Sequence, residues 1–145
     1  MNFDDFQRED WILSALALLL AIDLLFLPWF SFSLGPFTLT TTATGSFDGW
    51  TAILAVLACL LIVIDIVVER VSPATTVPTL GDGRARTRFV LATVAGGLVL
   101  LKFVLHIHFS WFVSGFYGGI VLAVLLVFAA WRIASGRPLY RPEIR

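Results

Sequence analysis

Four long apolar stretches are the feature that most constrains what this chain can fold into. They run over residues 11–30, 50–68, 89–109 and 116–131. Crossing the hydrocarbon of a bilayer takes about 20 helical residues, and an open backbone cannot face lipid. The stretches do not alternate between apolar and polar residues as barrel strands do. The sequence therefore predicts an all-α membrane protein, a four-transmembrane-helix bundle in a single domain over residues 1–145.

The composition points to the same class of protein. The 145 residues are 59% hydrophobic and only 14% charged, whereas about 25% of the residues in a soluble domain are charged. A soluble domain of this size buries only about 70% of the surface that its unfolded chain exposes. It could therefore not hide this much apolar surface inside itself. The formal net charge is zero, so no basic stripe is available for nucleic acid. The first expected partner is the lipid bilayer.

The basic residues predict the orientation of the helices. The connection between the second and third stretches and the C-terminal tail hold most of the arginines, whereas the other two connections contain no Lys or Arg. By the positive-inside rule, both termini and the middle connection lie in the cytoplasm. The sequence thus predicts a multi-pass protein of the plasma membrane. In that arrangement Trp11 and Trp131 lie at the inner membrane interface, and Trp29, Trp50 and Trp111 at the outer one.

The first outer connection carries a β pattern. Phe30, Phe32 and Leu34 alternate with serines, and Phe37 and Leu39 alternate with threonines after the turn residues Gly-Pro. Period-two alternation on both sides of a turn predicts a short β-hairpin. A lone hairpin is marginal in water, so its apolar face needs cover from the other outer connection, the bilayer surface or a second protein.

The second outer connection, residues 106–119, is rich in aromatic side chains. One interpretation is that the two outer connections pack on each other. The alternative is an aromatic surface that binds a neighbouring chain. In that case the outer recognition surface comprises Phe32, Phe37, Trp111, Phe112 and Tyr117.

Ionisable residues inside membrane stretches are the default functional candidates. Asp23 and Lys102 lie roughly 18 and 20 Å from the inner interface, at a rise of 1.5 Å per residue. A structural ion pair between them is the simplest prediction, and His106 follows Lys102 by one helical turn on the same face. The functional alternative for this cluster is a proton- or anion-sensitive site that opens to the outside.

Asp65 is the other charged candidate in the apolar stretches. It shares a helix face with Glu69, which is four residues later. Asp65 is expected to pair with Arg132 or Arg88 reaching in from the inner edge, or to bond polar groups on a neighbouring helix. A cation-binding carboxylate is the alternative. Close helix contacts are expected where small residues recur four apart, at Gly115 and Gly119.

Catalytic and cofactor motifs are not recognisable in the sequence. A single cysteine, Cys59, excludes an internal disulfide or redox pair. The two histidines, His106 and His108, fall on one segment at different angles, and neither a zinc-protease array nor a nucleophile elbow is present. The sequence predicts no catalytic residue, no metal ligand and no cofactor.

Several motifs suggest a resemblance. LPWF at residues 27–30, ATGSFDGW at 43–50 and GFYGG at 115–119, in a chain whose last apolar stretch ends in AAWR, resemble small four-span integral membrane proteins of actinobacteria. That group implies a bacterial source and no particular activity. The topology is also similar to that of claudins, with inner termini and a β-forming first outer loop, but the cysteine pair and the WGLW motif of claudins are absent.

The sequence predicts a non-enzymatic integral membrane protein that acts through association. It would be a homo-oligomer or an accessory subunit of a membrane complex, with the outer hairpin and aromatic loop as its recognition surface. The alternative is an oligomeric channel or transporter protomer that uses Asp23, Lys102, His106 and Asp65. A third reading is a sensor of external pH that acts through His106.

Overall fold

The computed structural model describes residues 7–75, 77–79, 83–106, 112–137 and 139. These residues form four helices and one two-stranded antiparallel sheet. The helices are α1 (Arg8–Phe26), α2 (Gly49–Val71), α3 (Arg84–Leu105) and α4 (Ser114–Ala134), and the strands are β1 (Pro28–Leu34) and β2 (Phe37–Thr42). The predicted helical bundle with one hairpin is confirmed.

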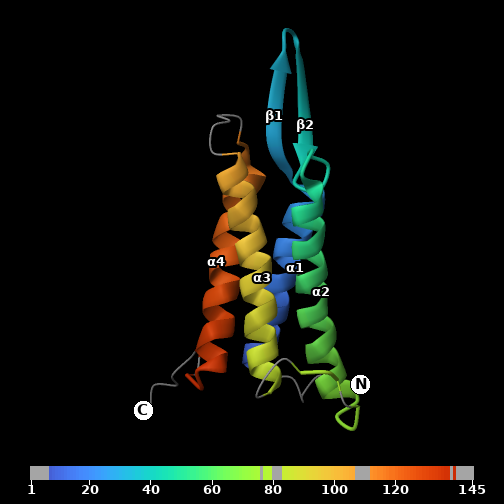
Figure 1. Ribbon diagram of the computed structural model, residues 1–145, viewed down its shortest axis with the longest axis vertical. Helices are drawn as coiled ribbons and strands as arrows, with labels where there is room; N and C mark the ends of the chain where they lie inside the picture. The colour runs from blue at the N-terminus through green and yellow to red at the C-terminus, as the bar shows by residue number, and fades with distance from the viewer. Residues whose placement is uncertain (1–6, 76, 80–82, 107–111, 138, 140–145) are drawn as a thin grey trace.

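The helices run alternately up and down, and the hairpin continues the long axis of the bundle (Figure 1). Each helix contacts the next along the chain and α4 returns to α1, so α1 and α3 occupy opposite corners. We call the end from which β1 and β2 project the hairpin end. The other end is the basic end, where α1 begins, α2 meets α3 through their connection, and α4 finishes.

Among the described residues, three helices are long and apolar enough to cross a membrane. They are α2 with 23 residues, α3 with 22 and α4 with 21. The first helix is shorter, with 19 residues, and it contains Arg8, Glu9, Asp10 and Asp23. Three of these charged residues stand in its first turn, and the helix packs against both α2 and α4.

The first apolar stretch divides between a helix and a strand. We expected a helix over residues 11–30, but α1 ends at Phe26 and residues 28–30 belong to β1. Pro28 explains this correction, because it lacks an N–H and restricts the preceding residue to extended backbone. At its other end α1 begins three residues early, where Gln7 and Asp10 form a capping box. The expected end of the third stretch, residues 107–109, lies outside the described residues.

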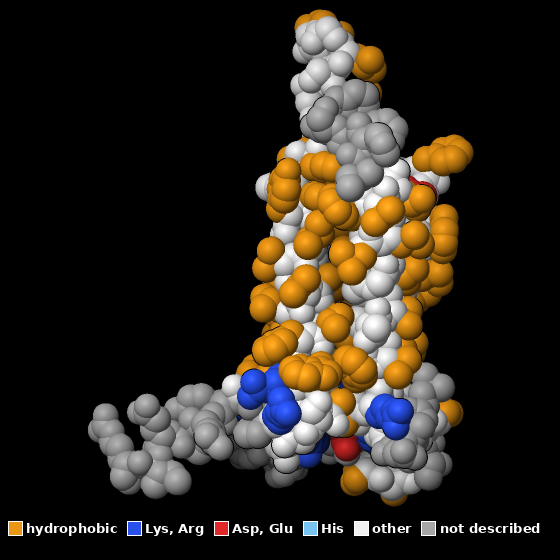
Figure 2. All heavy atoms as spheres, turned by 60° about the vertical axis from the view of Figure 1, so that its left-hand side comes forward, with side chains coloured by type: hydrophobic (Ala, Val, Ile, Leu, Met, Phe, Trp, Pro, Cys, Tyr) orange, Lys and Arg blue, Asp and Glu red, His pale blue; other side chains and the backbone are white. Residues whose placement is uncertain are grey.

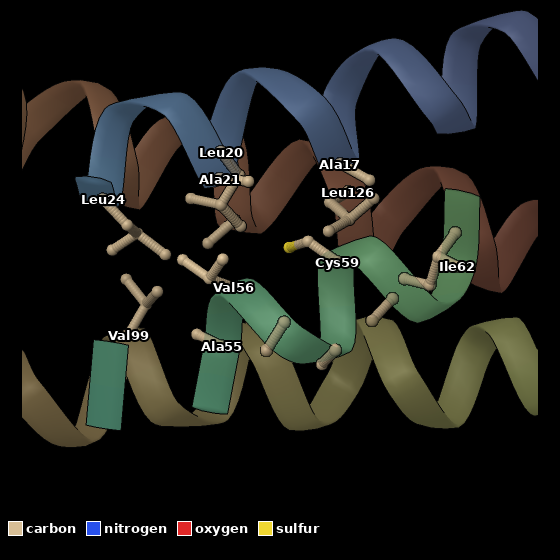
Figure 3. Close-up of a cluster of buried hydrophobic side chains, with 14 of the residues drawn as sticks. Ala17, Leu20, Ala21, Leu24, Ala55, Val56, Cys59, Ile62, Val99 and Leu126 are labelled. Atoms are coloured by element: carbon tan, nitrogen blue, oxygen red, sulfur yellow. The ribbon is translucent and has the colours of Figure 1, made fainter. Parts of the chain in front are cut away.

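Small and aliphatic side chains fill the centre of the bundle. Figure 3 shows α1, α2 and α4 meeting around Ala17, Leu20, Val56 and Leu126. Cys59 lies fully buried among them, as a small apolar side chain. Other leucines, valines and isoleucines point outward and cover the sides of the bundle with hydrophobic surface (Figure 2).

The hairpin register follows the alternation of its sequence. Phe32 pairs with Leu39 and Leu34 with Phe37, so Gly35 and Pro36 form the two-residue turn. Gly35 has a φ of +63°, the sign that a type II′ turn requires at its first central position. The predicted hairpin is confirmed, and it extends further toward the bundle than expected.

Candidate functional site

The hairpin has one apolar face and one hydroxyl face. Phe32, Leu34, Phe37 and Leu39 share one face, whereas the serines and threonines between them share the other. The apolar side chains near the turn are open to the surroundings: the exposed fraction is 71% for Phe37 and 58% for Leu39. The hairpin projects beyond the helices in both views of the molecule (Figures 1 and 2). Its tip is therefore a prominent exposed apolar surface.

The base of the hairpin packs on the connection between α3 and α4. Phe30 forms an isolated β-bridge with Phe112, and the Val113 N–H donates to the Trp29 carbonyl oxygen at 3.2 Å. The Phe112 ring stacks on Phe116 with centroids 3.8 Å apart. The prediction that the two outer connections pack on each other is confirmed at this base.

The five residues predicted as one recognition surface are divided by this packing. Phe32 and Phe37 lie on the apolar face of the hairpin, and Tyr117 is exposed at the start of α4. Phe112 is only partly exposed, because it fills the contact between the two connections. Trp111 lies outside the described residues.

Trp29 attaches the hairpin to the helices. A register irregularity between Pro28 and Phe30 leaves Trp29 without a strand partner, and its side chain is fully buried. Its indole Nε1 donates to Asp23 Oδ2 at 2.9 Å, and its ring meets Phe116 edge-on. The Trp29 ring therefore does not face outward, as the side chain of an interfacial anchor would. The indole lies inside the bundle because the buried carboxylate of Asp23 needs a donor.

Gly119 makes room for this contact, and replacing it provides a test. A Cβ at Gly119 would lie 2.4 Å from Trp29 Cζ2 and 2.6 Å from Asp23 Oδ2. We expect Gly119→Ala to lower the free energy of unfolding by roughly 1–3 kcal/mol, the range for overpacking. Gly97→Ala is the matched control, because a Cβ at Gly97 meets nothing within 4 Å. The melting temperature of each variant is measured as the temperature at which the buried Cys59 thiol reacts with a thiol-reactive fluorophore. Equal melting temperatures for the two variants would contradict the close contact.

Lys102 is the centre of a polar cluster at the hairpin end. We call Ser46, Asp48, Lys102 and His106 the lysine cluster. The Lys102 ammonium donates to Ser46 Oγ at 2.7 Å and lies 3.2 Å from Asp48 Oδ1. His106 Nδ1 donates to the Lys102 carbonyl oxygen, and His106 Nε2 lies 3.5 Å from Asp48 Oδ1. The predicted proximity of Lys102 and His106 is confirmed, but their carboxylate is Asp48.

The predicted Asp23–Lys102 pair is wrong. Asp23 accepts from Trp29, whereas Lys102 contacts Asp48. Both residues stand three positions before the end of their helix, but α1 and α3 lie at opposite corners of the bundle. Asp48 directly precedes α2, which is the neighbour of α3. Because α2 and α3 are antiparallel, α2 starts at the end of the bundle where Lys102 lies. The order of these consecutive antiparallel helices along the chain is a signal that could have identified the Lys102–Asp48 pair.

The surroundings of Asp48 favour its charged form. Burial alone raises the pKa of this carboxyl group, but the hydrogen bond and charge of Lys102, together with the charge of His106, outweigh burial. The pKa of Asp48 therefore lies below its ordinary value. Lys102 and Asp48 thus form a charged pair at the edge of the helices.

An arginine cluster joins three helices at the basic end. It comprises Asp10, Asp65, Glu69, Arg70 and Arg88. Arg88 Nε donates to Asp65 Oδ2 at 2.6 Å, and Arg88 Nη2 donates to Glu69. The predicted Asp65–Arg88 pair is confirmed.

Asp10 adds α1 to this cluster. Its Oδ2 accepts from Arg70 Nε at 2.8 Å, and its Oδ1 lies 3.6 Å from Arg88 Nη1. Sequence reasoning missed this role of Asp10. The available signal was an acidic residue in the first turn of a helix, at the same end as the arginines.

The four candidate residues of the transport alternative lie at three separate places. Asp23 contacts Trp29, Lys102 and His106 contact Asp48, and Asp65 contacts Arg88 near the opposite end. Each of the four has a polar partner within the chain, which for Asp23 is the neutral indole of Trp29. Within the described part of the chain, no group of three or more His, Cys, Asp or Glu residues could hold a metal ion.

Comparison of the chain with family models, with curated proteins and with solved structures finds no match. The assignment of function therefore rests on the geometry of this molecule.

Proposed function

We propose that this chain is a non-enzymatic four-span protein of a bacterial plasma membrane that acts by association. The hairpin is its recognition surface, and the chain works as a homo-oligomer or as an accessory subunit of a membrane complex. The observation that carries the proposal is the apolar face of the hairpin, whose phenyl and leucyl side chains are exposed beyond the end of the bundle.

The proposal includes α1 as the fourth span. Its 19 residues give a length of about 28 Å, close to the thickness of the hydrocarbon. Three of its charged residues stand in the first turn, and between Asp10 and Asp23 the helix carries no charge. Asp23 accepts the indole N–H of Trp29, which offsets part of the cost of a carboxyl group at this depth.

The proposed orientation places the basic end in the cytoplasm. Arg70, Arg84, Arg86, Arg88 and Arg132 lie at that end of the helices. Residues 27–48 and 106–113, which join the helices at the hairpin end, contain no Lys or Arg. The positive-inside rule then directs the hairpin to the outside.

Association through the hairpin makes a direct prediction. In the double variant Phe37→Ser/Leu39→Ser, we expect affinity for the partner to fall by at least about tenfold, because large apolar anchors dominate interfaces. The proteins are purified in mild detergent, and native mass spectrometry identifies the chains that remain together. We expect wild-type protein to carry a second copy or another membrane protein, and the variant to be a single chain.

Phe47→Ser is the matched control, since Phe47 is a fully exposed phenyl at the same end but outside the strands. It should retain the partner. Full retention of the partner by the hairpin variant, with the Cys59 thiol still protected, would refute the proposal.

A further inference from the structure

An apolar groove runs between α3 and α4 on the side of the bundle. Its volume is about 470 Å³, within the range of roughly 300–1,000 Å³ for small-molecule sites. Residues from both helices line it, among them Phe89, Thr93, Gly97, Val124, Phe128 and Trp131. The Thr93 hydroxyl donates to the Phe89 carbonyl oxygen at 2.8 Å. The groove therefore presents hydrocarbon and aromatic rings to whatever fills it.

The two glycines of α3 have different roles in this groove. A Cβ at Gly96 would lie 2.8 Å from Val127 Cγ2, so Gly96 lets the two helices approach. A Cβ at Gly97 would meet nothing within 4 Å. Gly97 thus leaves open the space that a longer side chain would fill.

Arginines flank the groove at the basic end. The Arg132 guanidinium lies over the Phe128 ring at 5.9 Å, and the Arg137 guanidinium lies over the Trp131 ring at 5.7 Å. Arg86 is exposed on α3, three residues before Phe89 and seven before Thr93, so it follows the same helix face. Figure 2 shows Lys and Arg side chains gathered below the hydrophobic band of the bundle.

We infer that this groove binds an anionic glycerophospholipid. One acyl chain lies along α3 and α4 over Gly97, and the phosphate contacts Arg132 and Arg137, with Arg86 on the other side. Guanidinium groups match phosphate oxygens in geometry and charge. Basic pockets on the cytoplasmic side of membrane helices bind such headgroups.

A lipid fits this groove better than a helix from a second chain. Helices approach closely over small residues, but bulky rings of Phe89, Phe128 and Trp131 occupy the basic half of the groove. Those rings and the arginines beside them match the acyl–headgroup boundary of a lipid. The inference rests on the proposed membrane location and does not depend on association through the hairpin.

Lipid titration tests the inference. Delipidated protein in detergent receives phosphatidylglycerol or phosphatidylcholine with identical acyl chains, and native mass spectrometry counts the bound lipid. We expect wild-type protein to retain phosphatidylglycerol at about tenfold lower lipid concentration than phosphatidylcholine. Arg132→Gln/Arg137→Gln should remove this preference, and Gly97→Leu should reduce the binding of both lipids.

Ala15→Leu is the control for Gly97→Leu, because it adds bulk at an exposed position of α1. It should leave lipid binding unchanged, as should Phe37→Ser/Leu39→Ser, so the two proposals fail separately. Equal binding of both lipids by wild-type protein would overturn the inference. So would a Gly97→Leu variant that is folded, by Cys59 protection, and retains the lipid. Dissociation of an oligomer by Gly97→Leu would identify the groove as a contact between protein chains and overturn it too.

Discussion

Replacing Arg88 with methionine is expected to lower the free energy of unfolding by about 3–5 kcal/mol, the cost of removing one partner from a buried ion pair. The Arg88 side chain and that of Asp65 are both almost fully buried. Without the guanidinium, Asp65 keeps a charge in the bundle with its main donor gone, and Glu69 loses a partner on α3. Denaturation with sodium dodecyl sulfate, followed by far-ultraviolet circular dichroism, measures the loss.

Two further variants distinguish the loss of the Arg88–Asp65 ion pair from the loss of a positive charge elsewhere on α3. Arg86→Met removes the same charge from an exposed position on the same helix, and we expect a change within about 0.5 kcal/mol. Arg88→Met/Asp65→Leu removes both buried charges and should recover much of the stability that Arg88→Met loses. In this double variant Asp10 still has its ion pair with Arg70. If Arg88→Met is as stable as Arg86→Met, the arginine cluster does not hold the helices together.

Replacing Lys102 with methionine is expected to cost about 1.5–3 kcal/mol, the value of hydrogen bonds to a charged group. The Lys102 side chain is 1% exposed and links α3 to the segment before α2 through Ser46 and Asp48. Methionine has a similar length but offers no donor. We expect the melting temperature in detergent to fall, and the double variant Lys102→Met/Asp48→Asn to lose less than the sum of the single variants. Additive losses would show that the two side chains do not interact.

Acid should weaken the ion pair between Lys102 and Asp48. Because the pKa of Asp48 is lowered in the folded protein, the unfolded chain takes up a proton first as the pH falls. The stabilisation is therefore complete above the ordinary aspartate pKa of about 3.9 and is lost as the pH falls through the lower folded value. Wild-type protein should lose more stability than Asp48→Asn between neutral pH and acid, followed by circular dichroism. Parallel pH profiles would contradict the charged pair.

Patterns local in the chain predicted the structure well. The alternation around Gly35 and Pro36 identified the hairpin, since period two places alternate side chains on one face. Arg88 was one of two arginines expected to reach Asp65 from the inner edge, and it is the one that lies on the helix following α2 in the chain. In both cases neighbouring elements along the chain supply the contact.

Contacts that depend on lateral arrangement could not be predicted in the same way. Equal depth suggested Asp23 and Lys102 as partners, but depth does not reveal which helices occupy opposite corners. Trp29 had the expected position for an interfacial anchor, yet the irregularity in β1 turns its side chain inward. The contact of Asp10 with Arg70 could not be inferred from a local pattern, because it joins positions 60 residues apart.

The length of the hairpin has a consequence for where recognition takes place. From buried Phe30 to Leu34 the strand rises by about 14 Å, at about 3.4 Å per residue, whereas the headgroup layer is only roughly 5–8 Å thick. With the bundle upright in the bilayer as proposed, Phe37 and the turn stand in water, above the reach of acyl chains. The membrane then cannot shelter these side chains. Under the proposed association, a partner would contact these side chains with its extracellular part, at a height set by Trp29, which ties the strand to α1.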